Sequence, residues 1–491
     1  MVVLVNVVPS EYYASIHELF RLGFPGAEIR RGVGEGNVFM EIECCEEGQQ
    51  FVIKGKIEDQ NVSTADRAVF DTTVKQPEIN RKIELRKFAF RLLCKHLQKN
   101  INPYGILTGV RPVKTVHRFL DQGTKADELE QRMQSEYLMD KSKAQLLCEI
   151  AKNNRPYLPD NEDHQRSISI YIGIPFCPTR CYYCSFPGAI LKNYEEEVPP
   201  FLEALKKELN EVGDSVKSLN LKVDAIYLGG GTPTILSEKD LEEVFSVLYE
   251  KYITEDTREI TVEAGRPDTL SLKKINKLFS LGVNRICVNP QTMNDHTLKR
   301  IGRNHTSQDI VQAVDWARQV GIEEINMDLI VGLPGEGMLD LLHTTREVLK
   351  LKPTNVTVHS LAVKRGSQLA ITEGLTKLES AIEMVAGGIH YLRQTLQENG
   401  FDPYYLYRQK YMKANMENIG YSLPGHYCVY NIQVMEERQT ILGMGGSASS
   451  KFVCPDGWTL TNSHNAKDPI TYIDSVDRLV NAKVDKLRGL N

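Results

Sequence analysis

The strongest constraint on the fold is a repeated alternation of short β-branched runs with amphipathic stretches between residues 165 and 400. This pattern predicts six strands, at 169–174, 224–228, 259–263, 284–288, 325–331 and 355–360. Helical periodicity fills the intervals, over 200–216, 238–251, 272–280, 307–319, 339–349 and 378–398. Six strand-then-helix units in succession require a parallel sheet with right-handed crossovers. A doubly wound sheet and a barrel-like sheet both satisfy that requirement.

The positions of the unusual residues favour the barrel. A cysteine-rich loop follows the first predicted strand, and Gly229-Gly-Gly-Thr-Pro233 follows the second. Glu263 closes the third strand, Pro290-Gln291 follows the fourth, and Gly332-Leu-Pro-Gly335 follows the fifth. Functional loops at the carboxyl ends of all the strands are typical of a β/α barrel.

The cysteine-rich loop carries the clearest chemical signal. In Tyr171-Ile-Gly-Ile-Pro-Phe-Cys177-Pro-Thr-Arg-Cys181-Tyr-Tyr-Cys184, three cysteines stand at CxxxCxxC spacing. Such a triplet suits a 4Fe-4S cluster that has three cysteine ligands and one iron open to a small molecule. Structural zinc, the alternative, would need a fourth cysteine or histidine nearby, and a redox dithiol would need only two cysteines. We therefore expect Cys177, Cys181 and Cys184 to hold a cluster.

Length and composition set the broad class of protein. At 491 residues the chain is too long for one ordinary core, so two or three domains are expected. Its formal net charge of -5 argues against a general nucleic-acid or membrane-surface binder, and no apolar run approaches the length of a membrane span. The N-terminus lacks a basic leader, so no signal peptide is expected. The other seven cysteines have no framework spacing, which indicates reduced thiols and a cytoplasmic location.

The regions on either side of the barrel have different patterns. Residues 1–160 are predicted to form an α+β domain of unknown role, with a hairpin at 38–44 and 51–57 and a helix at 78–99. Basic residues along that helix indicate a solvated face more than a contact with RNA or acidic lipid. The segment 160–163 is interpreted as the linker to the barrel at 165–400. Residues 401–491 are predicted to be a short extension that completes the substrate site, with an aromatic block at 403–410 and a glycine-rich run at 443–448.

An iron with an open position needs a chelating partner, and the amino and carboxylate groups of S-adenosylmethionine (SAM) supply one. The glycine-rich turn after the second strand would let backbone amides approach such a ligand, although a plain turn is the alternative. Glu263 and Asp328 are acids at strand ends and suit ribose hydroxyls or the sulfonium, or else serve as helix caps. Tyr171 lies on the first strand and could equally belong to the core.

Several motifs, in order, resemble those of one family. YIGIPFCPTRCYYCSF, YLGGGTPT, ITVEAGRPD, GVNRICVNPQT, IGRNHT, INMDLIVGLPGE and ENIGYSLPG are similar to the radical SAM superfamily, and to its oxygen-independent coproporphyrinogen III dehydrogenase-like proteins. Within these the chain most resembles the HemZ branch, from about residue 100 to the C-terminus. The resemblance implies that Cys177, Cys181 and Cys184 hold the cluster. It also implies SAM contacts by Tyr171, Gly230, Gly231, Thr232, Glu263, Gln291, Arg303, Asp328 and Ala362.

The resemblance also implies a fold and a reaction. The fold would be an incomplete (β/α)6 barrel of the TIM-like, radical SAM type, with the N-terminal domain and the C-terminal extension attached. The reaction would be oxidative decarboxylation of coproporphyrinogen III to protoporphyrinogen IX, with a reduced flavodoxin- or ferredoxin-type electron donor. Arg408 and Lys410 are charge-assisted partners for the substrate carboxylates, or else a surface pair that covers an apolar strand.

Two departures from the family pattern keep other functions open. Phe186 stands where dehydrogenases carry a further cysteine, and the family's separate C-terminal domain is expected to be missing. A haem-binding chaperone is therefore the alternative, with His359, His390, His426 or Cys428 as candidate axial ligands. An RNA-modifying radical enzyme is a third possibility, against which the acidic net charge counts.

Overall fold

The computed structural model describes residues 1–71, 77–159, 166–184, 188–361, 382–409, 417–454 and 458–489. The chain divides into two compact units, Met1–Glu149 and Ile150–Asn491. The linker expected at 160–163 lies outside the described residues. Among the described residues, no helix combines the length and apolar character needed to cross a membrane.

The first unit is a five-stranded sheet covered on one face by two helices. The strand order is β2-β1-β3-β4-β5, with β1 parallel to β2 and β3, and with β4 antiparallel to both β3 and β5. Alternate residues of β3 are buried against α1 and α2, as expected for a sheet with one solvated face. The pairing of β3 with β4 confirms the predicted hairpin. The elements are β1 (Val2–Val8), α1 (Tyr13–Gly23), β2 (Glu28–Arg31), β3 (Val38–Glu47), β4 (Gln50–Glu58), β5 (Ser63–Asp71), α2 (Pro77–Leu97), α3 (Val113–Asp121) and α4 (Leu129–Tyr137), and α5 (Lys141–Asn154) includes the boundary between the two units.

The basic residues of α2 have acidic partners within this unit. Arg81 lies 2.7 Å from Glu46 of β3, and Lys87 lies 2.8 Å from Glu84 on the same helix. These pairs satisfy part of the positive charge locally, which supports the interpretation of α2 as a structural helix with a solvated face.

The second unit is built on a curved sheet whose centre is parallel. Six strands, β6 (Ser167–Ile174), β9 (Lys222–Gly230), β10 (Glu259–Glu263), β11 (Arg285–Cys287), β12 (Glu324–Val331) and β13 (Asn355–Ser360), lie side by side in chain order. All five neighbouring pairs are parallel. These strands are buried on both faces, and all six coincide with the predicted positions.

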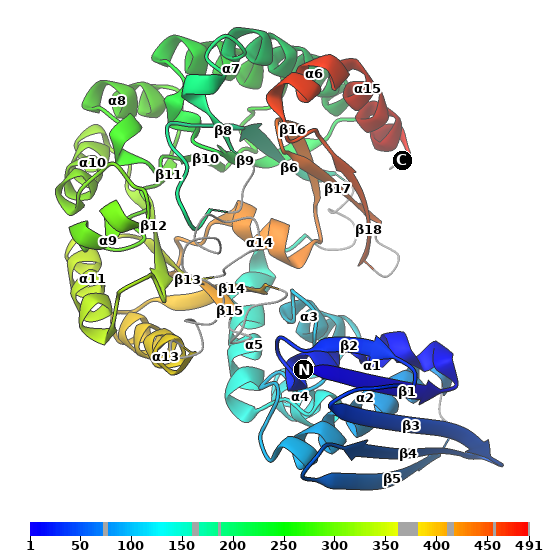
Figure 1. The fold of residues 1–491 in the computed structure, drawn as a ribbon. Coiled ribbons are helices and arrows are strands. Elements are labelled where there is room, and N and C mark those ends of the chain that lie inside the picture. The colour runs from blue at the N-terminus through cyan, green and yellow to red at the C-terminus, as the bar shows by residue number, and fades with distance from the viewer. Residues whose placement is uncertain are drawn as a thin grey trace. The chain divides into compact units, whose positions relative to one another are not determined.

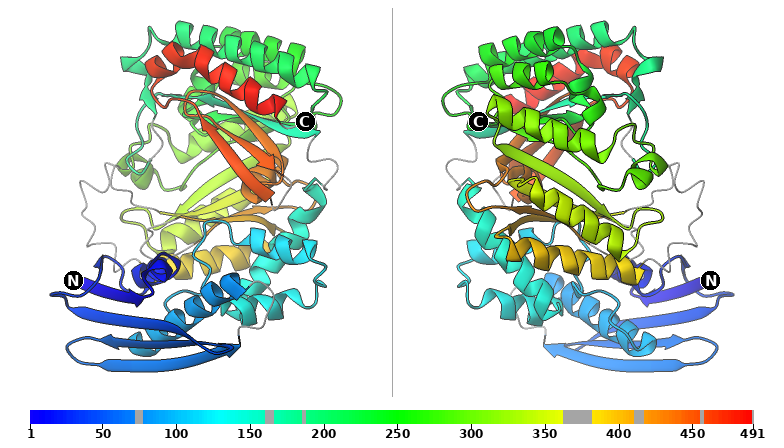
Figure 2. Two further views of the ribbon diagram at one scale, coloured as in Figure 1. Left: turned by 90° about the vertical axis from the view of Figure 1, so that its right-hand side faces the viewer. Right: turned by 90° about the vertical axis from the view of Figure 1, so that its left-hand side faces the viewer.

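The helices that connect these strands lie on the outer, convex side of the sheet (Figures 1 and 2). Capping boxes begin two of them, at Ser237 with Asp240 and at Thr306 with Asp309, which explains why their starts could be predicted. The helices are α6 (Val198–Ser218), α7 (Glu238–Lys251), α8 (Leu272–Ser280), α9 (Asp295–Arg300), α10 (Ser307–Val320), α11 (Met338–Lys350) and α13 (Ile382–Glu398).

The C-terminal strands continue this same sheet at both of its edges. On one side β15 (Glu417–Ser422) pairs antiparallel with β13, and β14 (Asp402–Arg408) follows. On the other side β16 (Thr440–Gly445) lies parallel to β6, followed by β17 (Ser449–Cys454) and β18 (Thr459–His464). Since β14 and β18 are the two edges of the described sheet, the barrel is open, and the fold is the expected incomplete (β/α)6 barrel. The division into domains at 1–160, 165–400 and 401–491 stays a prediction.

Two C-terminal helices complete the unit. α14 (Val429–Glu436) lies inside the curve of the sheet, where Tyr430 and Ile432 pack on Tyr227 and Ile441 (Figure 1). α15 (Pro469–Arg488) packs on α6.

Candidate functional site

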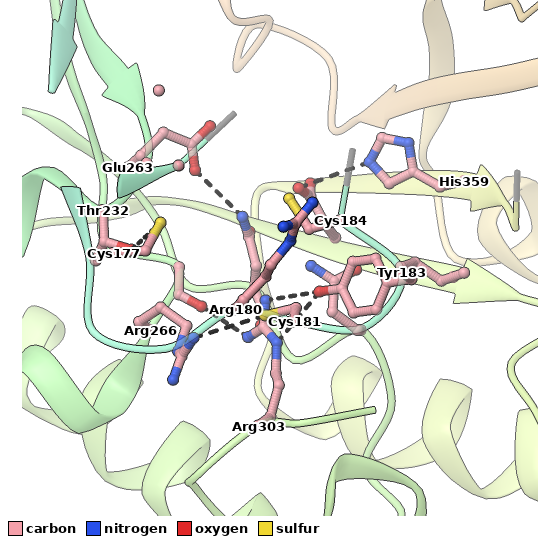
Figure 3. A pocket seen from close by; sticks show the side chains of 18 of the residues that line it. Cys177, Arg180, Cys181, Tyr183, Cys184, Thr232, Glu263, Arg266, Arg303 and His359 are labelled. Atoms are coloured by element: carbon pink, nitrogen blue, oxygen red, sulfur yellow. Dashed lines mark hydrogen bonds and ion pairs between the residues drawn. The ribbon is translucent and has the colours of Figure 1, made fainter. Parts of the chain in front are cut away.

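A cavity of about 440 Å³ opens at the carboxyl ends of the parallel strands. It is lined by loops that follow β6, β9, β10 and β11, and by side chains of β12, β13 and β14. Cys177 and His359 lie at opposite ends of the cavity in the view of Figure 3, and Cys181 and Cys184 lie between them. Of the residues predicted to hold the cluster or SAM, those that line this cavity are Tyr171, Cys177, Cys181, Cys184, Gly230, Gly231, Thr232, Glu263, Gln291, Arg303 and Asp328.

The cysteines are carried by a loop that begins in the short strand β7 (Phe176–Cys177). Thr232 donates to the sulfur of Cys177 at 3.6 Å, and Arg266 donates to the sulfur of Cys181 at 3.6 Å. Burial raises the pKa of the Cys177 thiol, and the Thr232 hydrogen bond opposes that rise. Hydrogen bonds of this kind stabilise thiolate sulfur, which a cluster ligand requires.

No group of three or more His, Cys, Asp or Glu side chains in the described residues surrounds a single point where one metal ion would sit. The three sulfurs are instead spread along the cavity wall (Figure 3). The donor set in the cavity lining includes these three cysteines at CxxxCxxC spacing. Three cysteine ligands fit a 4Fe-4S cluster that keeps one iron open to a small molecule.

Glycines hold the cysteine loop close to two neighbouring strands. A Cβ on Gly231 would lie 2.5 Å from the carbonyl oxygen of Phe176. On the other side of the loop, a Cβ on Gly446 would lie 2.8 Å from the ring of Pro175. Gly230 has a φ of 104°, which side-chain-bearing residues rarely adopt. The two glycine-rich runs of the sequence therefore pack against the cysteine loop on opposite sides.

Two arginines brace this end of the cavity. Arg303 donates at 2.8 Å to the carbonyl oxygens of both Gly265 and Asn289, and its other nitrogens contact the Tyr183 hydroxyl. Arg266 forms a two-bond ion pair with Asp268, at 3.0 and 2.9 Å. Both guanidinium groups are nearly buried, so their role within the described residues is to fix the loops that follow the strands.

Unsatisfied polar atoms next to the cavity indicate a ligand. The side-chain oxygens of Gln291 and Asn289 are buried without a hydrogen-bond partner. Gln291 also has a φ of 66°, unusual for this residue type. Its backbone bridges to β12, through bonds from Gln291 N to Asp328 O and from Ile330 N to Gln291 O. Buried acceptors on a strained, well-anchored backbone are typical of a binding site.

The two predicted acids have opposite pKa shifts. Burial, followed by the nearby charge of Asp328, raises the pKa of Glu263 to about 7. Glu263 accepts hydrogen bonds from the Tyr227 hydroxyl and, at 3.2 Å, from Asn289. Burial alone would raise the pKa of Asp328, but the hydrogen bond and charge of His359 lower it below its ordinary value. Neither acid caps a helix; both face the cavity.

The remaining candidate residues do not all reach the cavity. Arg408 is buried and is not among the lining residues, whereas its neighbours Tyr407 and Gln409 are. Ala362, Lys410 and Phe186 lie outside the described residues.

The four candidate haem ligands lie at different places in the structure. Of these, His359 lines the cavity. His390 is exposed on α13, and His426 lies 2.6 Å from Glu324 near the amino end of β12. Cys428 is buried 3.2 Å from Glu259.

Sequence reasoning missed an aromatic group on the cavity wall. Tyr227 and Tyr430 stack at a ring-centroid distance of 4.5 Å, and Tyr171 stacks on both at 6.2 and 6.0 Å. Tyr227 lies two residues after Ala225 on β9, and both belong to the inner cluster, so the period of two along a strand could have identified Tyr227 as inward-facing. Tyr430 could not, because nothing in the sequence places α14 inside the barrel.

Comparison with known proteins agrees with this site. Residues 171–348, which include the cysteine loop and most of the lining, match the model of the Radical SAM superfamily. The oxygen-independent coproporphyrinogen-III oxidase-like protein HemZ of Bacillus subtilis (strain 168) is 40% identical over 395 residues, which cover 79% of this chain and 77% of HemZ. The chain belongs to the radical SAM superfamily, in this coproporphyrinogen-III oxidase-like family. Radical SAM proteins use a 4Fe-4S cluster and SAM.

Other radical SAM relatives differ in their named roles. The heme chaperone HemW of Lactococcus lactis subsp. lactis (strain IL1403) is 32% identical over 287 residues, which cover 58% of this chain and 70% of HemW. Among solved structures, coproporphyrinogen III oxidase (HemN) from Escherichia coli aligns with a TM-score of 0.51 at 23% identity, over 64% of this chain and 70% of HemN. That structural likeness supports the fold.

Proposed function

We propose that this protein uses a 4Fe-4S cluster and SAM to decarboxylate two propionate side chains of coproporphyrinogen III oxidatively, forming protoporphyrinogen IX in haem biosynthesis. The observation that carries the proposal is the convergence on one cavity of the cysteine triplet and eight of the nine predicted SAM-binding residues. These residues come from six separate segments of the chain, so their meeting is a property of the fold.

The cysteine end of the cavity would hold the cofactors. Cys177, Cys181 and Cys184 would bind the cluster, with Thr232 and Arg266 donating to two of the sulfurs. Together the bound groups would supply a 5′-deoxyadenosyl radical.

Polar side chains on the neighbouring strands would hold the rest of SAM. Glu263 and Asp328 would accept hydrogen bonds from the ribose hydroxyls. The unpartnered side-chain oxygens of Gln291 and Asn289 would accept from amino groups.

The substrate end of the cavity would expose a propionate carbon to that radical. Removal of a hydrogen atom from the carbon next to the pyrrole ring, followed by loss of carbon dioxide and of one electron to an acceptor, gives the vinyl group. A reduced flavodoxin- or ferredoxin-type protein would supply the electron that starts each cycle. All ten cysteines are free thiols, which supports a cytoplasmic location.

Haem binding without turnover is the second candidate. Similarity to the heme chaperones and the position of His359 in the cavity favour it. Against it, both ring nitrogens of His359 already have partners, Asp328 and Tyr407, so an axial bond to haem iron would break one of these contacts.

One experiment separates the two functions. Anaerobically reconstituted protein is incubated with SAM, a low-potential reductant and coproporphyrinogen III, and the tetrapyrroles are analysed by mass spectrometry. The proposal predicts products that have lost one and then two carboxyl groups. Stoichiometric haem binding with intact substrate, in protein whose cluster is present, would establish the chaperone function instead.

A further inference from the structure

Side chains of β12, β13 and β14 form two rows of polar groups on the inner face of the sheet. Each row, called a rung below, contains one side chain from each of the three strands. In the inner rung the Thr357 hydroxyl donates to Oδ1 of Asn326 at 3.1 Å and lies 3.1 Å from the Tyr405 hydroxyl. All three side chains are buried, and none lines the cavity. This rung is a satisfied part of the core.

The outer rung repeats the pattern two residues further along each strand, at Asp328, His359 and Tyr407. Nε2 of His359 lies 3.6 Å from Oδ2 of Asp328, and its Nδ1 lies 3.2 Å from the Tyr407 hydroxyl. All three side chains are partly exposed and line the cavity, and Figure 3 shows His359 at the end away from Cys177. The polar groups of the outer rung are therefore accessible to a ligand in the cavity, whereas the similar groups of the inner rung are buried in the core.

The charges along the cavity make this end distinctive. Arg266 and Arg303 stand at the cysteine end, where Asp268 and backbone carbonyls engage them. At the other end the described donors include His359, Tyr407 and Gln409. Gln409 forms a hydrogen bond with Tyr407, and its own Oε1 is buried without a partner. Both the outer rung and Gln409, whose Oε1 has no partner, thus line this end of the cavity.

We propose that Tyr407, oriented by His359 and Asp328, binds a carboxylate of the substrate at this end of the cavity. The inference rests on the proposed function, in which the substrate is a tetrapyrrole that carries propionates. Tyr407 and His359 are then residues that position the substrate, and neither takes part in the bond-breaking step.

The proton on His359 decides whether Tyr407 can act in this way. In a neutral ring whose Nε2–H faces Asp328, Nδ1 accepts the Tyr407 proton, which leaves only lone pairs for the cavity. In the imidazolium both nitrogens donate, so the Tyr407 O–H turns to an acceptor in the cavity. Among the described residues, the titratable groups that interact with His359 are Asp328 from β12, Glu263 from β10 and Tyr407 from β14. Because two of them are acids, the carboxylate is bound beside an imidazolium whose two N–H groups donate to Asp328 and Tyr407.

Binding of a stable substrate analogue tests this inference. Fluorescence titration of the cofactor-loaded protein would compare coproporphyrin III, a tetracarboxylate, with its neutral tetraamide. Tyr407→Phe keeps the ring and removes the hydroxyl, and should weaken tetracarboxylate binding by roughly ten- to a hundredfold while changing tetraamide binding little. The matched control is Tyr405→Phe in the buried inner rung, which should leave the affinity for both ligands unchanged.

The results that would overturn the inference are distinct from a failure of the proposed function. Wild-type tetracarboxylate affinity in Tyr407→Phe would overturn it. If that variant does not fold, wild-type protein decides, because equal affinity for the acid and the amide would also overturn it. Either result in protein that still forms deoxyadenosine from SAM leaves the radical chemistry standing. Absence of deoxyadenosine would instead refute the proposed function.

Discussion

Replacing Gly231 by alanine would place a methyl group where the backbone of the cysteine loop already lies. The new Cβ would be 2.5 Å from the carbonyl oxygen of Phe176, and 2.9 Å from the carbonyl carbons of Phe176 and Pro175. Because these are backbone atoms, no side-chain rotation relieves the overlap, and the loop must move away from β9. That movement strains two hydrogen bonds, from Gly231 N to Ile174 O at 2.7 Å and from Thr232 N to Phe176 O at 2.8 Å.

The cost of that movement can be estimated. Overpacking typically costs about 1–3 kcal/mol, and loss of one such bond adds about 1 kcal/mol, so we expect Gly231→Ala to lower the free energy of unfolding by about 2–4 kcal/mol. The displaced loop carries Cys177, so cluster content should fall as well. Urea unfolding of the cofactor-free protein measures the first effect, and iron and sulfide analysis after anaerobic reconstitution measures the second.

A second glycine supplies the control. Gly387 is exposed within α13, and a Cβ there would meet nothing within 4 Å. Gly387→Ala should therefore raise stability slightly, by about 0.5–1 kcal/mol, and leave cluster content unchanged. Wild-type stability and iron content in Gly231→Ala would refute the reasoning that close backbone contact holds the cysteine loop in place.

Further predictions concern the cluster, one acid and the C-terminal helix. Cys177→Ala should remove most cluster absorbance and all deoxyadenosine formation, whereas Cys454→Ala, exposed and outside the motif, should spare both; equal iron content in the two variants would contradict the ligand assignment. The pKa of Glu263, raised to about 7, gives a stability contribution that is full below about pH 4.5 and is lost as pH rises through about 7. Glu263→Gln should therefore flatten the melting-temperature profile of the cofactor-free protein across that window, and an unchanged slope would be inconsistent with the shift. Lys483 and Glu208 form a fully buried ion pair between α15 and α6. Lys483→Met should therefore lower the free energy of unfolding in urea by about 3–5 kcal/mol, and adding Glu208→Gln should recover part of that loss. An unchanged free energy of unfolding in the single variant would show that the pair does not stabilise the fold.

Much of the barrel could be predicted because its signals are local. The six parallel strands are short apolar runs buried on both faces, and capping residues such as Ser237 and Thr306 mark helix starts. The cavity residues were recognisable for a related reason. Parallel strands bring their carboxyl ends to one rim, so residues such as Glu263 and Asp328, far apart in the chain, were expected to meet.

What the sequence could not show depends on long-range pairing. The outer rung needs the antiparallel register of β14 and β15 beside β13, which no local pattern specifies. In that register Tyr407 lines the cavity and Arg408 does not. The sequence had instead suggested Arg408 as the substrate contact, because of its charge. The glycine-rich run around Gly446 had no predicted role, because its contact with the cysteine loop arises only when β16 pairs with β6.

The most direct test of the radical decarboxylation uses coproporphyrinogen III carrying deuterium on the propionate carbon next to each pyrrole ring. The substrate is incubated anaerobically with reconstituted protein, SAM and reductant, and deoxyadenosine and tetrapyrroles are both analysed by mass spectrometry. If the hydrogen atom is taken from that carbon in the cavity described above, deuterium appears in deoxyadenosine and the tetrapyrrole loses carbon dioxide. Unlabelled deoxyadenosine together with fully carboxylated substrate, in protein whose cluster is intact, would contradict the proposed reaction.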